Sequence, residues 1–285
     1  MIDEPLRGAI AAELGHEVVS AVRVRGGDVA SSWRVDLDDG RRVFAKTHPT
    51  APPLFFSTEA AGLRWLAAAQ AVAVPAVLGV RDEPSNLLVL EWIDEGRRSP
   101  SDESQFGRQL AELHRAGSPV FGRQDRRTTG SRGLPNEPCD AWAEFYGTQR
   151  LLPLARLAHG VLPPTAISGL ELLAGKLDEF AAADEPPARL HGDLWAGNRV
   201  VDARGASWLI DPAAHGGHRE FDLAMMRLFG GFGDAAFAAY DDVHPLAAGW
   251  PERIALHQIA PLVIHAVKFG GGYVGAAAAA ITTYV

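Results

Sequence analysis

The chain has 285 residues, of which 47% are hydrophobic and 22% charged, so it can bury a substantial core and is not expected to be disordered. Its 27 basic and 35 acidic side chains give a net charge of −8, which argues against a nucleic-acid binder or a protein of anionic membrane surfaces. The single cysteine, Cys139, excludes an intrachain disulfide and a multi-cysteine metal site. Residues 1–4 lack a signal-peptide pattern and no uncharged apolar run reaches about 18 residues. We therefore expect a cytoplasmic protein with no membrane partner.

The first 90 residues have the pattern of strands, with valine-rich runs separated by turns that contain glycine or aspartate. One helix is expected among them at residues 57–70, where Glu59, Leu63 and Leu66 share a face. The predicted strands cover residues 18–25, 31–37, 41–47, 77–81 and 87–92.

After Gly96 the pattern becomes helical, with Phe106, Leu110 and Leu113 forming one apolar stripe. This division predicts an α+β protein with two lobes, over residues 1–92 and 93–285, and a ligand cleft between them. Further helices are expected at 142–158, at 167–182 and from 220 to the end, and a hairpin pairs 199–202 with 207–210.

The strongest chemical signal is the segment HGDLWAGN at residues 191–198, followed by Asp211. Phosphoryl transfer from ATP requires one carboxylate near the acceptor hydroxyl and further oxygen ligands that hold Mg²⁺ against the phosphates. Asp193 and Asn198 have the spacing of a loop that presents both groups to one site, and Asp211 ends the hairpin that this loop opens. The alternative is a polar turn before an unrelated hairpin, which the D-x-x-x-x-N spacing disfavours.

A second signal is the pair of Lys46 and Glu59. A carboxylate on an apolar helix face is costly unless it is paired, and Lys46, one of only three lysines, is the natural partner. Such a pair would direct the lysine to the nucleotide phosphates. The alternative is a solvated lysine at a strand end with a glutamate favoured by the helix dipole.

A third signal is the turn that contains Gly26 and Gly27. Its main-chain N–H groups could cover phosphates, although the sequence is neither G-x-G-x-x-G nor a Walker A motif. Taken alone it is a common hairpin turn, and its place before the Lys46 strand is what favours a phosphate loop.

The chain resembles the fructosamine (ketosamine-3-) kinase family from about Gly26 to Tyr273. That family has the two-lobed protein-kinase-like fold of aminoglycoside phosphotransferases, with a small antiparallel-sheet N-lobe and a large helical C-lobe. The motifs that carry the resemblance are HGDLWAGN at 191–198, IDPA at 210–213, GHRE at 217–220, DLAM at 222–225 and FGGF at 229–232.

The resemblance implies a role for individual residues. Asp193 would be the catalytic base, and Asp222 would brace the main chain of the catalytic loop. The cofactors would be ATP and Mg²⁺. The implied cofactor and metal contacts are the glycine turn at Gly26 and Gly27, the phosphate lysine Lys46 with its partner Glu59, the adenine hinge of Leu90, Glu91, Trp92 and Ile93, and the magnesium ligands Asn198 and Asp211.

The sequence departs from the family's pattern at two places. Ala30 stands where the glycine loop usually has asparagine, which puts the details of the phosphate loop in doubt. The run Ala214, His215 and Gly216 replaces bulkier residues, which would alter or widen the acceptor side.

The acceptor side is expected to include Trp195 and His215. The Trp195 ring either stacks on the sugar or on its cationic amine, or lies buried between helices. Arg150 either binds an acceptor hydroxyl or caps its helix. Because Asp193, Glu220 and Asp222 are close in sequence, we expect an acidic acceptor side with Gly216 leaving room beside His215.

These features together predict a kinase that transfers the γ-phosphate of ATP to a sugar hydroxyl of a ketosamine, a fructosamine or a ribulosamine, either free or bound to protein. The alternatives are a kinase of aminoglycosides or amino alcohols on the same scaffold, and a nucleotide-binding module without turnover. The sequence does not indicate an oligomeric state.

Overall fold

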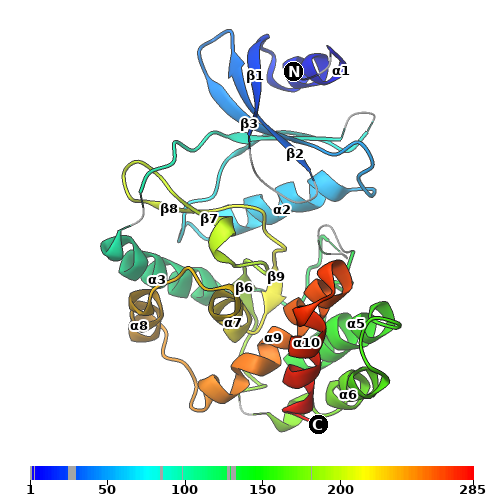
Figure 1. Cartoon of the computed structure of the whole chain (residues 1–285). Coiled ribbons are helices and arrows are strands. Elements are labelled where there is room, and N and C mark those ends of the chain that lie inside the picture. The colour runs from blue at the N-terminus through cyan, green and yellow to red at the C-terminus, as the bar shows by residue number, and fades with distance from the viewer. Residues whose placement is uncertain are drawn as a thin grey trace.

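The computed structural model describes residues 2, 4–24, 30–83, 86–97, 99–126, 129, 133–180 and 182–285. The fold is two-lobed and α+β, as predicted, with a five-stranded antiparallel sheet above a helical lobe (Figure 1). The strand order is β1-β2-β3-β5-β4. The N-terminal lobe comprises α1 (Glu4–Leu14), β1 (Val18–Val24), β2 (Ser31–Leu37), β3 (Arg42–Thr47), α2 (Phe55–Ala67), β4 (Val77–Arg81) and β5 (Leu87–Glu91).

Both faces of the sheet are covered by helices, which explains the continuous apolar run of β5. Leu87 and Val89 pack with Ile10 of α1, whereas Leu88 and Leu90 pack with α2. A strand that is buried on both faces loses the alternation of apolar and polar residues. The five predicted strands are confirmed, but α1 was not predicted.

The C-terminal lobe has two hydrophobic cores. One joins α4, α5 and α6 to α9 and α10, and the other joins α3, α7 and α8. The regular elements of this lobe are α3 (Pro100–Arg115), α4 (Trp142–Tyr146), α5 (Leu152–Leu157), α6 (Pro164–Ala174), β6 (Ala188–Leu190), β7 (Arg199–Val201), β8 (Ser207–Leu209), β9 (His215–Gly217), α7 (Glu220–Phe229), α8 (Asp234–Val243), α9 (Trp250–Phe269) and α10 (Gly272–Thr282).

Three elements of this lobe differ from the sequence-based expectation. The helix expected at 167–182 ends at Ala174, because Gly175 follows it and a separate 3₁₀ turn covers Leu177–Glu179. The strands β6 and β9 pair with each other and were not predicted. Each has three residues, which is too short to show a period.

The helical run predicted at 142–158 is confirmed, but it contains an irregularity that the sequence did not indicate. Between α4 and α5 the residues Gly147–Leu151 form a π-helical turn. Such turns are rare and occur frequently at functional sites. Arg150 lies in this turn.

The hairpin of β7 and β8 is confirmed and lies between the sheet and the helices of the C-terminal lobe (Figure 1). It carries Asn198 before its first strand and Asp211 after its second. Among the described helices, none has the length and apolar character needed to cross a membrane.

The contact between α3 and α8 yields a stability prediction. A Cβ added at Gly107 would lie 2.0 Å from the main-chain oxygen of Ala236, so Gly107→Ala must push the two helices apart. We expect a loss of about 1–3 kcal/mol in the free energy of unfolding, measured by urea denaturation.

The matched control is Gly275→Ala in α10, where nothing lies within 4 Å of the added atom. There the better helix propensity of alanine should stabilise the protein by up to about 1 kcal/mol. A Gly107→Ala variant as stable as the parent would show that this helix contact does not restrict the side chain.

Candidate active site

Asp222 of α7 anchors the segment that precedes Asp193. Its Oδ2 accepts the main-chain N–H of His191 at 2.7 Å, and its Oδ1 accepts that of Gly192 at 2.9 Å. The Asp222 side chain is fully buried and also contacts His114 at 3.3 Å. Asp222 therefore has the geometry of the brace that the family resemblance implied.

His191 and Gly192 fix the path of the loop. The His191 Nδ1 accepts the main-chain N–H of Asp193 at 3.2 Å, so its Nε2 carries the proton and donates to the oxygen of Ile210 at 2.8 Å. Gly192 has a φ of +79°, and a Cβ there would lie 2.2 Å from the oxygen of Ala213. Only glycine fits this position. The fixed main chain at Gly192 in turn sets the direction in which the next side chain, that of Asp193, leaves the loop.

Asp193 and Asn198 lie in contact, as their spacing predicted. The Asn198 Nδ2 donates to the main-chain oxygen of Asp193 at 2.9 Å and to its Oδ2 at 3.1 Å. Burial raises the pKa of the Asp193 carboxyl to about 7, although the hydrogen bond from Asn198 acts in the opposite direction and lowers this pKa. A carboxylate with this pKa is well placed to accept a proton near neutral pH.

Asn198 and Asp211 are brought together by the hairpin. The main-chain N–H of Ile210 donates to the oxygen of Asn198 at 3.0 Å, and Asp211 follows with a φ of +54°. The Asn198 Nδ2 lies 3.5 Å from the main-chain oxygen of Asp211, and because Asn198 donates through this Nδ2, its amide oxygen remains as an acceptor. These are the hard oxygen ligands that Mg²⁺ prefers, so the donor set fits this metal.

Lys46 joins the N-terminal lobe to this group. Its Nζ lies 2.7 Å from the Glu59 Oε1 and also donates to the Asp211 Oδ1. Burial alone would lower the pKa of Lys46, but the two carboxylates hold it above its ordinary value, so the side chain is charged. The alternative of a solvated lysine at a strand end is wrong, since only 7% of the Lys46 side chain is exposed.

The residues expected to form the adenine hinge lie at the end of β5 and in the segment after it. The side chain of Leu90 is buried under α2, while the Glu91 N–H donates to the oxygen of Ala76 at 2.9 Å. Trp92 and Ile93 follow the strand, and Trp92 Nε1 donates to Asp94. Gly26 and Gly27 lie outside the described residues.

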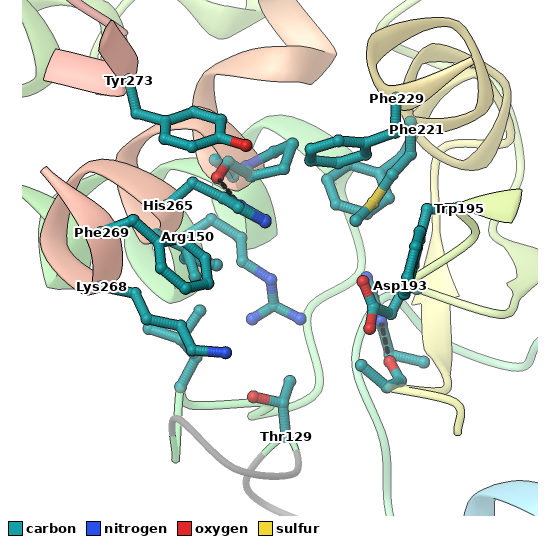
Figure 2. Close-up of a pocket in the computed structure, with 18 residues that line it drawn as sticks. Thr129, Arg150, Asp193, Trp195, Phe221, Phe229, His265, Lys268, Phe269 and Tyr273 are labelled. Carbon is teal, nitrogen blue, oxygen red and sulfur yellow. Dashed lines mark hydrogen bonds between the residues drawn. The ribbon is translucent and has the colours of Figure 1, made fainter. Parts of the chain in front are cut away.

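A cavity of about 610 Å³ opens beside the catalytic loop (Figure 2). Aromatic side chains form much of its wall and Asp193 lies on one side of it. All of its lining residues belong to the C-terminal lobe: Thr129, Leu134, Arg150, Gly192, Asp193, Trp195, Ala213, His215, Phe221, Met225, Phe229, Ala260, Pro261, Ile264, His265, Lys268, Phe269 and Tyr273.

Trp195 and His215 both line this cavity. Trp195 is 44% exposed, so the alternative of a ring buried between helices is wrong. His215 is buried, and its Nδ1 contacts the oxygen of Ala213 at 2.8 Å. Burial lowers the pKa of His215 to about 3, so it is neutral at physiological pH.

The expected space at Gly216 is not there. A Cβ at Gly216 would lie 2.0 Å from the main-chain oxygen of Val120, so this glycine allows a close packing of two chain segments. It does not line the cavity.

The expectation of an acidic acceptor side is also wrong. Glu220 and Asp222 are both fully buried. Glu220 accepts hydrogen bonds from Arg253, and Asp222 accepts them from the catalytic loop. Asp193 is the one carboxylate among the described residues that line the cavity.

Another buried cluster, His218, Glu220 and His257, has the composition of a metal site. The His218 Nε2 donates to the oxygen of Ala182 at 2.9 Å, and its Nδ1 accepts the N–H of Glu220 at 3.2 Å. Both Glu220 oxygens accept from Arg253. The ligand atoms of His218 and Glu220 are thus used within the protein, and the arrangement does not fit zinc.

Comparisons with known proteins agree with this architecture. The family model for fructosamine kinase matches residues 7–285. The chain belongs to the fructosamine kinase family. The relatives of the chain include a probable ketoamine kinase of Synechocystis sp., which is 35% identical over 256 residues that cover 88% of this chain and 85% of the relative. A chloroplastic protein-ribulosamine 3-kinase of Arabidopsis thaliana is 32% identical, and the match covers 100% of this chain and 89% of the relative.

Solved structures give the same result. A protein of Thermobifida fusca with the provisional name fructosamine-3-kinase has 38% identity and a TM-score of 0.90, with 98% of each chain covered. Amicoumacin kinase hAmiN, solved with AMP-PNP and Ca²⁺, has 13% identity and a TM-score of 0.65, and the match covers 99% of this chain and 92% of that kinase. A likeness at this identity shows the fold alone. The chain is therefore a phosphotransferase-family enzyme with a protein-kinase-like fold.

The cavity wall contributed by α9 and α10 was not assigned a role from the sequence. His265 and Phe269 lie one helical turn apart in α9, and Tyr273 of α10 packs against both, with ring centroids 5.1 Å from His265 and 6.1 Å from Phe269. The sequence signal was the rare Lys268 within this aromatic repeat.

The ion pair of Lys46 and Glu59 yields a kinetic prediction. Lys46→Met and Glu59→Gln should each lower kcat/KM for ATP by about 10²–10³-fold, because the cation expected at the nucleotide phosphates would be lost or misdirected. The double variant should lose little more than either single variant, since both changes break one interaction.

The control is the Arg81 and Glu13 pair, which lies at 2.7 Å in the same lobe away from the catalytic loop. Changes there should leave kcat/KM for ATP at the parental value. Additive losses in the Lys46 and Glu59 cycle would show that the pair has no functional coupling.

Proposed function

We propose that the chain is an ATP-dependent, Mg²⁺-dependent kinase that transfers the γ-phosphate to a sugar hydroxyl of a ketosamine, either a fructosamine or a ribulosamine. The observation that supports this most strongly is the position of Asp193. Its carboxylate contacts Asn198 of the phosphate side and also lines the aromatic cavity. One proton acceptor thus lies at the junction of a nucleotide site and an acceptor site.

The proposed mechanism assigns each residue one task. Asp193 orients the acceptor hydroxyl and takes its proton as the oxygen attacks the γ-phosphate. Lys46, held charged by Glu59, offsets negative charge on the phosphates. Asn198 and Asp211 would hold the metal, which supplies charge neutralisation on the phosphate oxygens when it is bound.

The nucleotide side belongs to the N-terminal lobe and the hinge. In this proposal residues 1–92 form the nucleotide lobe, and the main chain at Leu90, Glu91, Trp92 and Ile93 binds adenine. The glycine turn at Gly26 and Gly27 remains a prediction for the phosphates. The AMP-PNP bound to amicoumacin kinase on the same fold supports the choice of ATP.

The acceptor side belongs to residues 93–285. The names of the Synechocystis and Arabidopsis relatives support a ketosamine substrate. The half-exposed Trp195 ring offers a flat face to a sugar, and it could also bind the cationic amine. The buried His215 closes the cavity behind the acceptor. We expect the enzyme to act in the cytoplasm.

An ATP-turnover screen tests this proposal. We expect phosphorylation of a fructosyl- or ribulosyl-amine with a kcat/KM well above that for aminoglycosides, choline or free sugars. Excess EDTA should abolish turnover, and Asp193→Asn should reduce it by about 10²–10⁴-fold, because the proton acceptor is lost. Preferred turnover of an aminoglycoside or an amino alcohol would replace the ketosamine with that acceptor.

The role of Trp195 is tested separately. Trp195→Ala should raise KM for the ketosamine by about tenfold, the order of a lost stacking contact, while KM for ATP stays unchanged. Trp195→Phe keeps a flat ring and should recover most of the loss. A Trp195→Ala variant with parental ketosamine kinetics would remove the ring from the acceptor site.

A further inference from the structure

Arg150 lies in the π-helical turn Gly147–Leu151, and only 3% of its surface is exposed. Its guanidinium donates to the main-chain oxygens of Pro135 at 2.6 Å and Gln149 at 2.9 Å, and to the Asn136 Oδ1 at 2.7 Å. It also lies over the Phe145 ring, 4.6 Å from the centroid. Every one of these partners is neutral.

The absence of an acidic partner sets Arg150 apart. Among the described residues five arginines are buried, and the other four each form an ion pair with a carboxylate. Arg150 has no such pair within the described chain. These four pairs are Arg123 with Asp125, Arg199 with Glu103, Arg219 with Glu185 and Arg253 with Glu220.

A buried cation without a counter-charge is costly to the folded protein. Burial lowers the pKa of Arg150 to about 10, and the guanidinium is still charged at neutral pH. The three hydrogen bonds to neutral oxygens hold the side chain in place but do not supply a negative charge. They also leave two of the five N–H donors of an arginine without a partner among the described residues.

Arg150 lines the acceptor cavity together with Lys268. Figure 2 shows the guanidinium of Arg150 and the ammonium of Lys268 directed into the cavity, across from Asp193. The Lys268 Nζ lies 4.6 Å from the centroid of the Phe269 ring. Since His215 is neutral and Asp193 is the one lining carboxylate, the wall that faces Asp193 is cationic.

We propose that Arg150 and Lys268 form a subsite for an anionic group on the acceptor. This inference rests on the proposed ketosamine kinase function. Two sources would supply the charge: the free carboxylate of a ketosamine formed on the amino group of an amino acid, or a phosphate on the sugar of the ketosamine. Either anion would give Arg150 the counter-charge that the protein itself does not provide, through hydrogen bonds to both oxygens.

The experiment compares three acceptors with the wild-type enzyme. N-fructosylglycine and N-fructosylglycinamide have the same size and differ in one negative charge, and N-fructosylglycinamide 6-phosphate carries the charge at the sugar end. We expect kcat/KM for one of the two anionic compounds to exceed that for the neutral amide by about 10- to 100-fold, mainly through a lower KM.

Variants then connect the preference to the subsite. Arg150→Gln and Lys268→Met should each bring the ratio of anionic to neutral kcat/KM toward one, and Arg150→Lys should retain part of it. Lys176→Met, a lysine of the same lobe that does not line the cavity, removes the same charge and should leave the ratio unchanged.

Each outcome decides the matter. A preference for the glycine compound assigns the subsite to a carboxylate, and a preference for the 6-phosphate assigns it to a phosphate. Equal kcat/KM for all three, or a preference that survives in both Arg150→Gln and Lys268→Met, overturns the subsite and leaves the ketosamine kinase function intact. If Arg150→Gln does not fold, the wild-type comparison and Lys268→Met decide. Turnover of none of the three is a failure of the proposed function itself and overturns the subsite with it.

Discussion

The active site depends on one buried carboxylate, that of Asp222. A charged group in the interior is stable only if hydrogen bonds replace its lost water, and Asp222 obtains them from the main-chain N–H groups of His191 and Gly192 and from His114. Although burial alone would raise it, these bonds hold the pKa of Asp222 below its ordinary value. The carboxylate therefore remains ionised and fixes the two residues that precede Asp193.

The geometry of the other functional groups follows from this anchor. The His191 side chain donates a hydrogen bond to the main-chain oxygen of Ile210, at the end of the β7–β8 hairpin. This bond fixes the position of Ile210, and Asp211 comes next in the chain. Asp211 in turn accepts a hydrogen bond from Lys46, which belongs to the sheet of the other lobe. A continuous path of hydrogen bonds, with the peptide link between Ile210 and Asp211, thus runs from the helical lobe to the N-terminal lobe. Since Glu59 also contacts Lys46, movement of α2 would change the position of this cation.

Much of this arrangement could be predicted from the sequence, because the catalytic loop is local. Asp193 and Asn198 are separated by a short segment, and a hairpin joins Asn198 to Asp211. The five strands were recognisable by their valine-rich runs and turns. Helix α1 was missed because its residues, with Pro5 and Gly8, do not show a clear apolar face, and its buried side, with Ile10, becomes evident only where it packs against the sheet.

The acceptor side was predicted less well, because it depends on the direction of side chains and not on their spacing. Glu220 and Asp222 are close to the catalytic segment in sequence, but both side chains are buried in the protein. Glu220 pairs with Arg253 there, and Asp222 accepts the main-chain N–H of His191. The π-helical turn at Gly147–Leu151 is likewise a tertiary feature, since a Cβ at Gly147 would lie 2.9 Å from the oxygen of Ala174.

The electrostatic character of the cavity follows from this use of the acidic residues. The carboxylates that the sequence places near the catalytic loop stabilise the scaffold, so they do not contribute negative potential to the acceptor. Asp193 is the one carboxylate among the described residues that line the cavity, and Arg150 and Lys268 lie on the facing wall. At the low effective dielectric of a buried site, Arg150, which has no ion pair within the described chain, would interact strongly with a charge on the substrate. In the proposed subsite, this cationic wall would discriminate between acceptors by the charge that they carry at a distance from the reacting hydroxyl, in addition to the proposed contact between Trp195 and the sugar.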